Sequence, residues 1–372
     1  MTETQLERRA RLMGPNMPTF YDTPLHIVRA CGMWLWDANG QCYLDCYNNV
    51  PHVGHGHPAV IEAVAQQLAT LNTHSRYLHD GILDYAEDLT ATLGHGLSQM
   101  IFTCTGSEAN DIAIRVAQAV TGQTGLIATD ATYHGNTVAT SALSTRRPPI
   151  GGYPPQVRLV PAPDGTITDL TFASHVQAAI DDLAANGFGF SGMLLCPVFA
   201  NEGLPPVQPG FFKPTEDVIR QANGLVLCDE VQPGFGRCGS HFWGHDWLGI
   251  TPDLITIGKP MGNGYPVAGL IARPDIMAAF RTVFGYFNTF GGSPVAAAAA
   301  HATLRVVQSE KLQENAFRSG QYTISRLRSI DHPMIRKIHG LGLFFGVTLA
   351  HRDGSPASAY CREVVELSLI HI

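Results

Sequence analysis

The sequence has little charge and no long apolar run. Charged residues make up only 15% of its 372 residues, and no lysine or arginine run interrupts the net charge of -7. This balance argues against a surface for nucleic acid or for an anionic membrane. Because no stretch of roughly 20 apolar residues is present, we expect no membrane-spanning helix. We also identify no signal peptide in residues 1–18.

Paired cysteines are missing too. The eight cysteines are dispersed along the chain, and none of them forms a CxxC pair. We therefore expect free, mostly buried thiols and a reducing, cytoplasmic location.

The apolar content is high enough for a large core. Hydrophobic residues make up 45% of the chain, and apolar runs alternate with helical patterns. This alternation predicts an α/β fold with a mostly parallel, seven-stranded sheet and helices on both faces. The expected strands are residues 100–104, 125–129, 157–160, 193–196, 225–228, 254–257 and 267–272. The expected helices include residues 108–119, 215–223 and 294–307.

The two ends of the chain predict a second, smaller α+β domain. Short strands are expected at residues 27–30, 33–37, 41–44 and 342–349. We expect residues 1–50 to join this small domain, residues 51–295 to form the large domain and residues 296–372 to complete the small one. The helical pattern of residues 357–367 stops without a C-cap or a following strand. We therefore expect an incomplete small domain and a natural chain that continues past residue 372.

Residues 105–110 read TGSEAN, at the point where a strand stops and a helix begins. Gly106 permits close backbone approach, and Ser107 is a residue type suited to cap the helix. Exposed N–H groups and the helix dipole favour an anion there. A capped helix without a ligand would give the same pattern.

Asp229 and Glu230 follow the buried strand 225–228, at the sheet edge where α/β proteins bind ligands. A nucleotide triphosphatase would also need a GxxxxGK[ST] loop, but the one Gly-Lys pair, at residues 258–259, precedes proline. Residues 234–239 match GxGxxG, yet no helical pattern follows them. We therefore expect these glycines to turn the chain past a ligand.

Lys259 ends the apolar strand 254–257, directly after Gly258. A buried lysine is unfavourable unless it is neutralised or covalently used, and an imine bond achieves this. A strand-end lysine that points to water is the alternative. An anion site, a strand-end acid and a strand-end amine together match the phosphate, pyridine nitrogen and aldehyde of pyridoxal 5'-phosphate (PLP). The sequence thus predicts a PLP site with Lys259 and Asp229 as its catalytic residues.

Three histidines, His52, His55 and His57, alternate with other residues in one short segment. Glycines interrupt them, and no carboxylate or cysteine lies nearby with a familiar ligand spacing. We expect a structural turn at an interface or pocket rim and no metal site.

Taken together, these motifs resemble the class III aminotransferases, PLP enzymes of fold type I, over about residues 33–346. The matching segments are residues 106–110, 133–137 (YHGNT), 229–237, 258–259 and 289–292. Residues 47–55, 71–80 and 258–264 resemble the alanine–glyoxylate aminotransferase 2-like subgroup, which includes ethanolamine-phosphate phospho-lyases.

The resemblance implies roles for the residues around the cofactor ring. Lys259 would form the Schiff base and move the proton, and Asp229 would keep the pyridine nitrogen protonated. Gln232 would contact the ring hydroxyl, while Tyr133 and Val231 would pack on opposite ring faces.

The resemblance also implies a phosphate site and a dimer. Gly106 and Ser107 would hold the cofactor phosphate, joined by Thr289 of the partner subunit. That shared site implies a homodimer.

Two departures from the family pattern concern the substrate side. Cys196-Pro197 stands where members usually have Glu-Pro, and Asn201 followed by Glu202 stands near a glutamate that some members use to switch substrates. The family's arginine for a substrate carboxylate, often in the C-terminal domain, is not identified here.

For the activity, the resemblance implies ping-pong transfer of an amino group from an amine or amino acid to a 2-oxo acid. Residues 133–137 resemble the transaminase form of their motif. The alternative is a phospho-lyase acting on a phosphorylated amino alcohol such as O-phosphoethanolamine. A PLP-binding protein without activity is a third reading, which the presence of Lys259 and Asp229 opposes.

Overall fold

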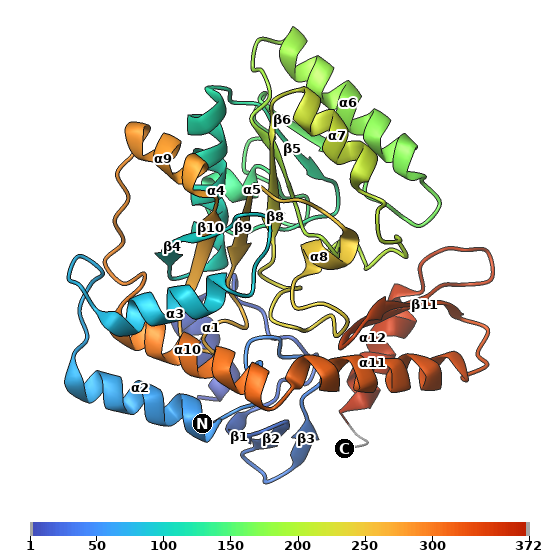
Figure 1. Cartoon of the computed structure of the whole chain (residues 1–372). Coiled ribbons are helices and arrows are strands. Elements are labelled where there is room, and N and C mark those ends of the chain that lie inside the picture. The colour runs from blue at the N-terminus through green and yellow to red at the C-terminus, as the bar shows by residue number, and fades with distance from the viewer. Residues whose placement is uncertain (1–2, 370–372) are drawn as a thin grey trace.

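A seven-stranded β-sheet forms the centre of the molecule (Figure 1), a computed structural model that describes residues 3–369. Along the sheet lie β4 (Gln99–Thr103), β10 (Ala268–Ala272), β9 (Leu254–Ile257), β8 (Leu225–Asp229), β7 (Gly192–Leu195), β5 (Leu126–Thr129) and β6 (Val157–Val160). The last five strands run parallel, whereas β10 runs antiparallel to both β4 and β9. The expected mostly parallel sheet is therefore confirmed, and each strand lies within one residue of its expected bounds.

Helices cover both faces of this sheet, as expected (Figure 1). One face carries α4 (Gly106–Thr121), α5 (Val138–Ser141) and α9 (Pro274–Val283). The other face carries α3 (Asp80–Thr90), α6 (Asp169–Ala185), α7 (Lys213–Gln221) and α10 (Pro294–Ser309). This arrangement agrees with the fold that the resemblance implies.

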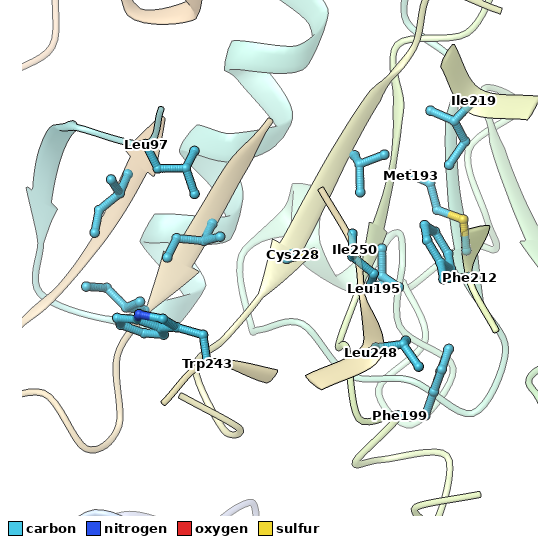
Figure 2. Packing of buried hydrophobic residues seen from close by; sticks show 14 of the residues in the cluster. Leu97, Met193, Leu195, Phe199, Phe212, Ile219, Cys228, Trp243, Leu248 and Ile250 are labelled. Atoms are coloured by element: carbon cyan, nitrogen blue, oxygen red, sulfur yellow. The ribbon is translucent and has the colours of Figure 1, made fainter. Parts of the chain in front are cut away.

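Alternating side chains of each strand fill two separate cores. In β7, Met193 and Leu195 pack on the α6 side, and Leu194 packs on the α4 side. Figure 2 shows the first core, where Met193 and Leu195 lie near Phe212, and all three side chains are fully buried. Burial on both faces explains why these strands read as unbroken apolar runs in the sequence.

The remaining elements, most of them from the two ends of the chain, are smaller sheets and helices around this centre. They are α1 (Gln5–Met13), β1 (Ile27–Cys31), β2 (Trp34–Asp37), β3 (Cys42–Leu44), α2 (Pro58–Thr70), α8 (Gly244–Leu248), α11 (Leu312–Arg328), β11 (Ile335–Leu341), β12 (Phe344–Leu349) and α12 (Ser358–Ser368). Strands β1–β3 form one sheet, and β11 pairs with β12 in another.

The two ends touch each other. The backbone N–H of Asp22 donates to the Glu366 carboxylate at 2.8 Å, and Arg362 pairs with Asp22 at 2.6 Å. These contacts join the N-terminal segment to α12, although the two small sheets stay separate. The expected division at residues 50 and 295 stays a prediction. Residues 1–2 and 370–372 of the expected outer segments lie outside the described part of the chain.

All eight cysteines are free, but the expectation that most are buried is wrong. Only Cys196, Cys228 and Cys238 are buried: Cys228 lies within β8, and Cys196 and Cys238 pack together in a small core. Of the other five, three are exposed. Within residues 3–369, no helix is both long enough and apolar enough to cross a membrane.

Candidate active site

Helix α4 begins at the carboxyl end of β4 through a capping box. The Thr105 hydroxyl accepts from the backbone N–H of Glu108 at 3.1 Å, and the Glu108 carboxylate accepts from the Thr105 N–H at 3.0 Å. The expectation that Ser107 caps the helix is therefore wrong, because the T-x-x-E spacing favours Thr105. Ser107 lies inside the first turn instead, where its hydroxyl accepts from the Asn136 N–H at 3.1 Å.

Glycines allow other segments to pack closely against the start of this helix. A β-carbon on Gly106 would lie 2.8 Å from the Val231 side chain, and one on Gly135 would lie 2.6 Å from the Ser107 hydroxyl. Gly135 also has a φ of 141°, a conformation that side chains rarely adopt. Only glycine therefore lets Val231 and the loop at residue 135 pack this closely against the first turn of α4, at the edge of the cavity that Gly106 and Gly135 line.

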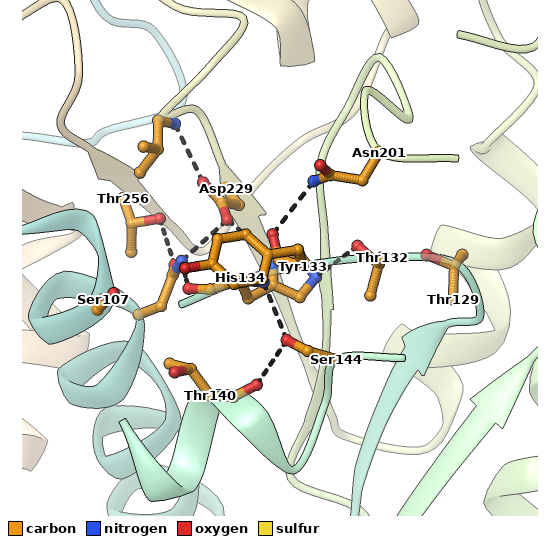
Figure 3. Close-up of polar contacts among 12 residues, drawn as sticks. Ser107, Thr129, Thr132, Tyr133, His134, Thr140, Ser144, Asn201, Asp229 and Thr256 are labelled. Atoms are coloured by element: carbon orange, nitrogen blue, oxygen red, sulfur yellow. Dashed lines mark hydrogen bonds and ion pairs between the residues drawn. The ribbon is translucent and has the colours of Figure 1, made fainter. Parts of the chain in front are cut away.

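The Asp229 carboxylate ends β8 and is almost fully buried, with 6% of the residue exposed. Its Oδ2 accepts from the Asn110 amide and from Nδ1 of His134, both at 2.8 Å (Figure 3). Its Oδ1 accepts from the Val231 N–H at 3.0 Å. Three donors thus stabilise the negative charge and fix the orientation of the carboxylate.

Further hydrogen bonds fix these donors in turn. The Thr256 hydroxyl on β9 donates to the Asn110 oxygen at 2.6 Å, and the Asn110 amide also donates to the His134 carbonyl at 2.8 Å. The Thr132 hydroxyl lies 3.2 Å from Nε2 of His134, and Ser144 accepts from the His134 N–H at 3.1 Å (Figure 3). The network ties α4, β8 and β9 to the loop that follows β5.

Lys259 follows β9 and is half-buried beside Asp229. Burial lowers the pKa of its amine below the usual value, and the negative charge of Asp229 opposes this shift. A lysine with a lowered pKa is more often neutral, which is the form that attacks an aldehyde or accepts a proton. Lys259 therefore does not point freely into water, which was the alternative.

Seven of the eight expected site residues line a single cavity of about 120 Å³. They are Gly106, Ser107, Tyr133, Asp229, Val231, Gln232 and Lys259. Asn110, His134, Gly135, Cys196 and Asn201 complete the lining. The structure thus brings the anion site, the acid and the amine together, as the sequence predicted from three separate segments.

The eighth residue, Thr289, is exposed and lines a different cavity with Tyr265 and Phe290. It does not reach the Lys259 cavity of its own chain. Its expected role in the active site of a partner subunit stays a prediction, as does the homodimer.

Two lining residues are held by contacts beyond the cavity. The Tyr133 hydroxyl donates to Asn136 at 2.8 Å, and burial raises the pKa of this phenol. The Gln232 side-chain oxygen accepts from the Asn49 amide at 3.3 Å, which connects the cavity to the N-terminal segment. Both side chains are therefore oriented before any ligand binds.

The residues at which this sequence departs from the family pattern lie in or near the cavity. Cys196 and Asn201 line the cavity, and the Asn201 amide donates to the Tyr133 carbonyl at 3.2 Å (Figure 3). Glu202 points away, where its Oε1 accepts from the Thr129 hydroxyl at 2.5 Å. Its Oε2 has no hydrogen-bond partner among the described residues, and burial raises its pKa.

The glycines of residues 234–239 turn the chain, as expected, and pack it against α11. A β-carbon on Gly236 would meet Gln313, and one on Gly239 would meet the backbone of Phe317. Both contacts belong to α11. Both glycines are therefore needed for close helix packing, and the expectation of a ligand at this turn stays a prediction.

The three clustered histidines each contact a different partner. His52 lies 2.7 Å from the Phe235 carbonyl, and burial lowers its pKa to about 3. His55 pairs with Asp45 at 2.6 Å, and His57 pairs with Glu310 at 3.1 Å. The imidazoles thus secure a turn, as expected.

The donor set fits PLP. An amine of lowered pKa, a buried and fully oriented carboxylate, and a helix N-terminus with a glycine-lined space surround one cavity. These groups match the aldehyde, the pyridine nitrogen and the phosphate of that cofactor.

Comparison with known proteins agrees with this geometry. A family model described as aminotransferase class-III matches residues 17–370. The chain belongs to the class III aminotransferase family. The expected family is therefore confirmed. The family depends on PLP, which confirms the expected cofactor for the family as a whole.

The relatives of this class III family member include both reaction types. An alanine–glyoxylate aminotransferase 2-like protein of Drosophila melanogaster is 37% identical over 94% of this chain and 74% of its own length. The ethanolamine-phosphate phospho-lyase homolog 1 of Caenorhabditis elegans is 36% identical over 93% of this chain and 80% of its own. A solved Arthrobacter phospholyase in complex with phosphoethanolamine is 39% identical, with a TM-score of 0.95, over 98% of this chain and 89% of that one.

The sequence analysis did not identify the residues that hold the Asp229 carboxylate in place. Asn110 and His134 lie inside motifs that carried the resemblance, but no role was assigned to either. Thr256 lies on β9, three residues before Lys259, and nothing in the sequence indicates that its hydroxyl reaches Asn110.

We predict that Lys259→Ala abolishes the visible absorbance of the cofactor imine and lowers turnover by roughly 10²–10⁴-fold or more. The reason is that the cavity then lacks its amine. Absorbance spectra and steady-state rates measure both effects. Lys213→Ala, which removes an exposed lysine paired with Asp217, is the matched control and should leave both unchanged. A normal spectrum and normal turnover in Lys259→Ala would contradict the assignment.

Proposed function

We propose that this chain is a PLP-dependent phospho-lyase that releases inorganic phosphate from a phosphorylated amino alcohol such as O-phosphoethanolamine. The likeness to the phospholyase solved with phosphoethanolamine carries the proposal, since it extends over nearly the whole chain. The overall reaction would convert O-phosphoethanolamine and water into acetaldehyde, ammonia and phosphate.

The residues of the cavity have distinct tasks in this proposal. Bound PLP would withdraw electrons from the substrate carbon next to the amino nitrogen. Lys259 removes the proton from that carbon, a role that its lowered pKa supports. Asp229 holds a proton on the cofactor ring nitrogen, because the network of Asn110 and His134 keeps its charge in place.

A phosphate leaving group requires a cation, and Arg147 is the candidate. Its positive charge acts on the Tyr133 hydroxyl and opposes the rise in the pKa of Tyr133 that burial causes. Tyr133 lines the cavity, whereas Arg147 is exposed and is not among the lining residues. We propose that Arg147 binds the substrate phosphate, as guanidinium groups commonly do.

Amino-group transfer to a 2-oxo acid is the second candidate. The Drosophila relative, an aminotransferase 2-like protein of nearly equal identity, favours it. The same lysine and aspartate would serve both reactions, since each begins with loss of the same proton. The two candidates differ in whether phosphate leaves or a second substrate accepts the amino group.

We predict that the purified, PLP-loaded chain releases phosphate and acetaldehyde from O-phosphoethanolamine without any 2-oxo acid. Phosphate is measured colorimetrically, and acetaldehyde by coupled reduction. A parallel assay supplies an amine and pyruvate and measures alanine. Alanine formation without phosphate release from O-phosphoethanolamine would overturn the phospho-lyase proposal in favour of transamination.

We predict that Arg147→Gln raises the KM for O-phosphoethanolamine about tenfold to hundredfold, because a charge-assisted contact to phosphate is lost. Arg146→Gln is the matched control: Arg146 is an exposed neighbour whose charge does not act on Tyr133. Steady-state kinetics with both variants measure the effect. If KM changes equally in the two variants, or does not change in Arg147→Gln, Arg147 does not bind the substrate phosphate.

A further inference from the structure

A cluster of two histidines and an aspartate lies outside the PLP cavity, between the turn that follows α3 and the short helix α8. Nε2 of His95 and Nε2 of His245 each lie 3.6 Å from the same oxygen, Oδ1 of Asp246. The three potential ligand atoms all lie within 4.8 Å of one another. Two ligands bound to one tetrahedral zinc ion are about 3.4 Å apart, so the cluster needs little movement to hold one.

His245 gives the decisive observation. Its side chain is completely buried, yet Nε2 has no hydrogen-bond partner among the described residues. A buried polar nitrogen without a partner is unfavourable and calls for an explanation. Nε2 faces Asp246 and His95, and a cation between them would satisfy it.

Glu230 prepares His245 for that task. Its Oε1 accepts from Nδ1 of His245 at 2.8 Å and from the His245 backbone N–H at 2.7 Å. Its Oε2 accepts from the Gly244 N–H at 3.0 Å. With the proton held on Nδ1, the lone pair of the neutral imidazole lies on Nε2 and faces the cluster. A carboxylate behind a histidine is the arrangement that orients histidine ligands at metal sites.

The turn that carries His95 is also held in place. The indole N–H of Trp243, a fully buried residue just before α8, lies 3.1 Å from the Thr92 carbonyl and 3.2 Å from the Thr92 hydroxyl. Leu97 packs in the same core as Trp243, where Figure 2 labels both, and this packing fixes the other side of the turn. His95 is thereby kept opposite α8.

From these contacts we propose that His95, His245 and Asp246 bind a divalent transition-metal ion, with zinc as the ion best matched to two imidazoles and one carboxylate. The side chains of His95 and Asp246 are about one-third exposed, at 32% and 34%, so the ion can enter from solvent. The bound ion ties the turn after α3 to α8 and, through Glu230, to the end of β8. It braces the segment next to Asp229 and takes no part in the chemistry at Lys259.

Isothermal titration of the untagged, chelator-treated holoenzyme with zinc chloride tests this site. We expect one zinc per chain in the wild type, and at least about tenfold weaker binding in His95→Ala and in Asp246→Asn. His241→Ala is the matched control, because His241 is an exposed histidine of the same segment that contacts Ser240 instead. It should bind zinc like the wild type. Any zinc that binds to exposed thiols would bind equally to the wild type and to the three variants, so it cannot cause a difference between them.

Zinc should also raise the thermal unfolding midpoint of the wild type and of His241→Ala, but not that of His95→Ala. The absence of a one-per-chain site in the wild type, or equal zinc affinity in the wild type and His95→Ala, overturns the proposal. If circular dichroism shows that His95→Ala does not fold, Asp246→Asn decides in the same way. None of these outcomes depends on whether the enzyme releases phosphate.

Discussion

The buried negative charge of Asp229 is the constraint around which the site is built. A carboxylate at the end of a central strand is stable only if donors surround it. Asn110 from α4, His134 from the loop after β5, and the Val231 N–H supply them. Thr256 then fixes Asn110, so three parts of the sheet and one helix share a single hydrogen-bonded network. This rigidity places Asp229 and Lys259 in one cavity before any cofactor binds.

Two consecutive acids at the end of β8 serve different neighbours. Asp229, the last residue of β8, faces the cavity, whereas Glu230, the next residue, faces α8 and binds His245. The proposed metal ion and the proposed phospho-lyase chemistry share this strand end but depend on different groups.

Much of this architecture could be predicted from the sequence, and the physical reasons are clear. Strands buried on both faces leave unbroken apolar runs, and Lys259 and Asp229 stand at the ends of two of them. The cap at Thr105 was mistaken for Ser107 because both are good capping residues and only the hydrogen bonds distinguish them. His95 and His245 lie far apart in the chain, so no local spacing could reveal that their nitrogens approach the same aspartate.

In the proposed function, Asp229 keeps the pyridine nitrogen of bound PLP protonated. Nitrogen-15 NMR of the holoenzyme, loaded with PLP labelled at the ring nitrogen, measures this protonation. We expect the resonance of a protonated pyridine in the wild type and that of an unprotonated one in Asp229→Asn. An unprotonated ring nitrogen in the wild type, or the same resonance in both proteins, would contradict this role of Asp229.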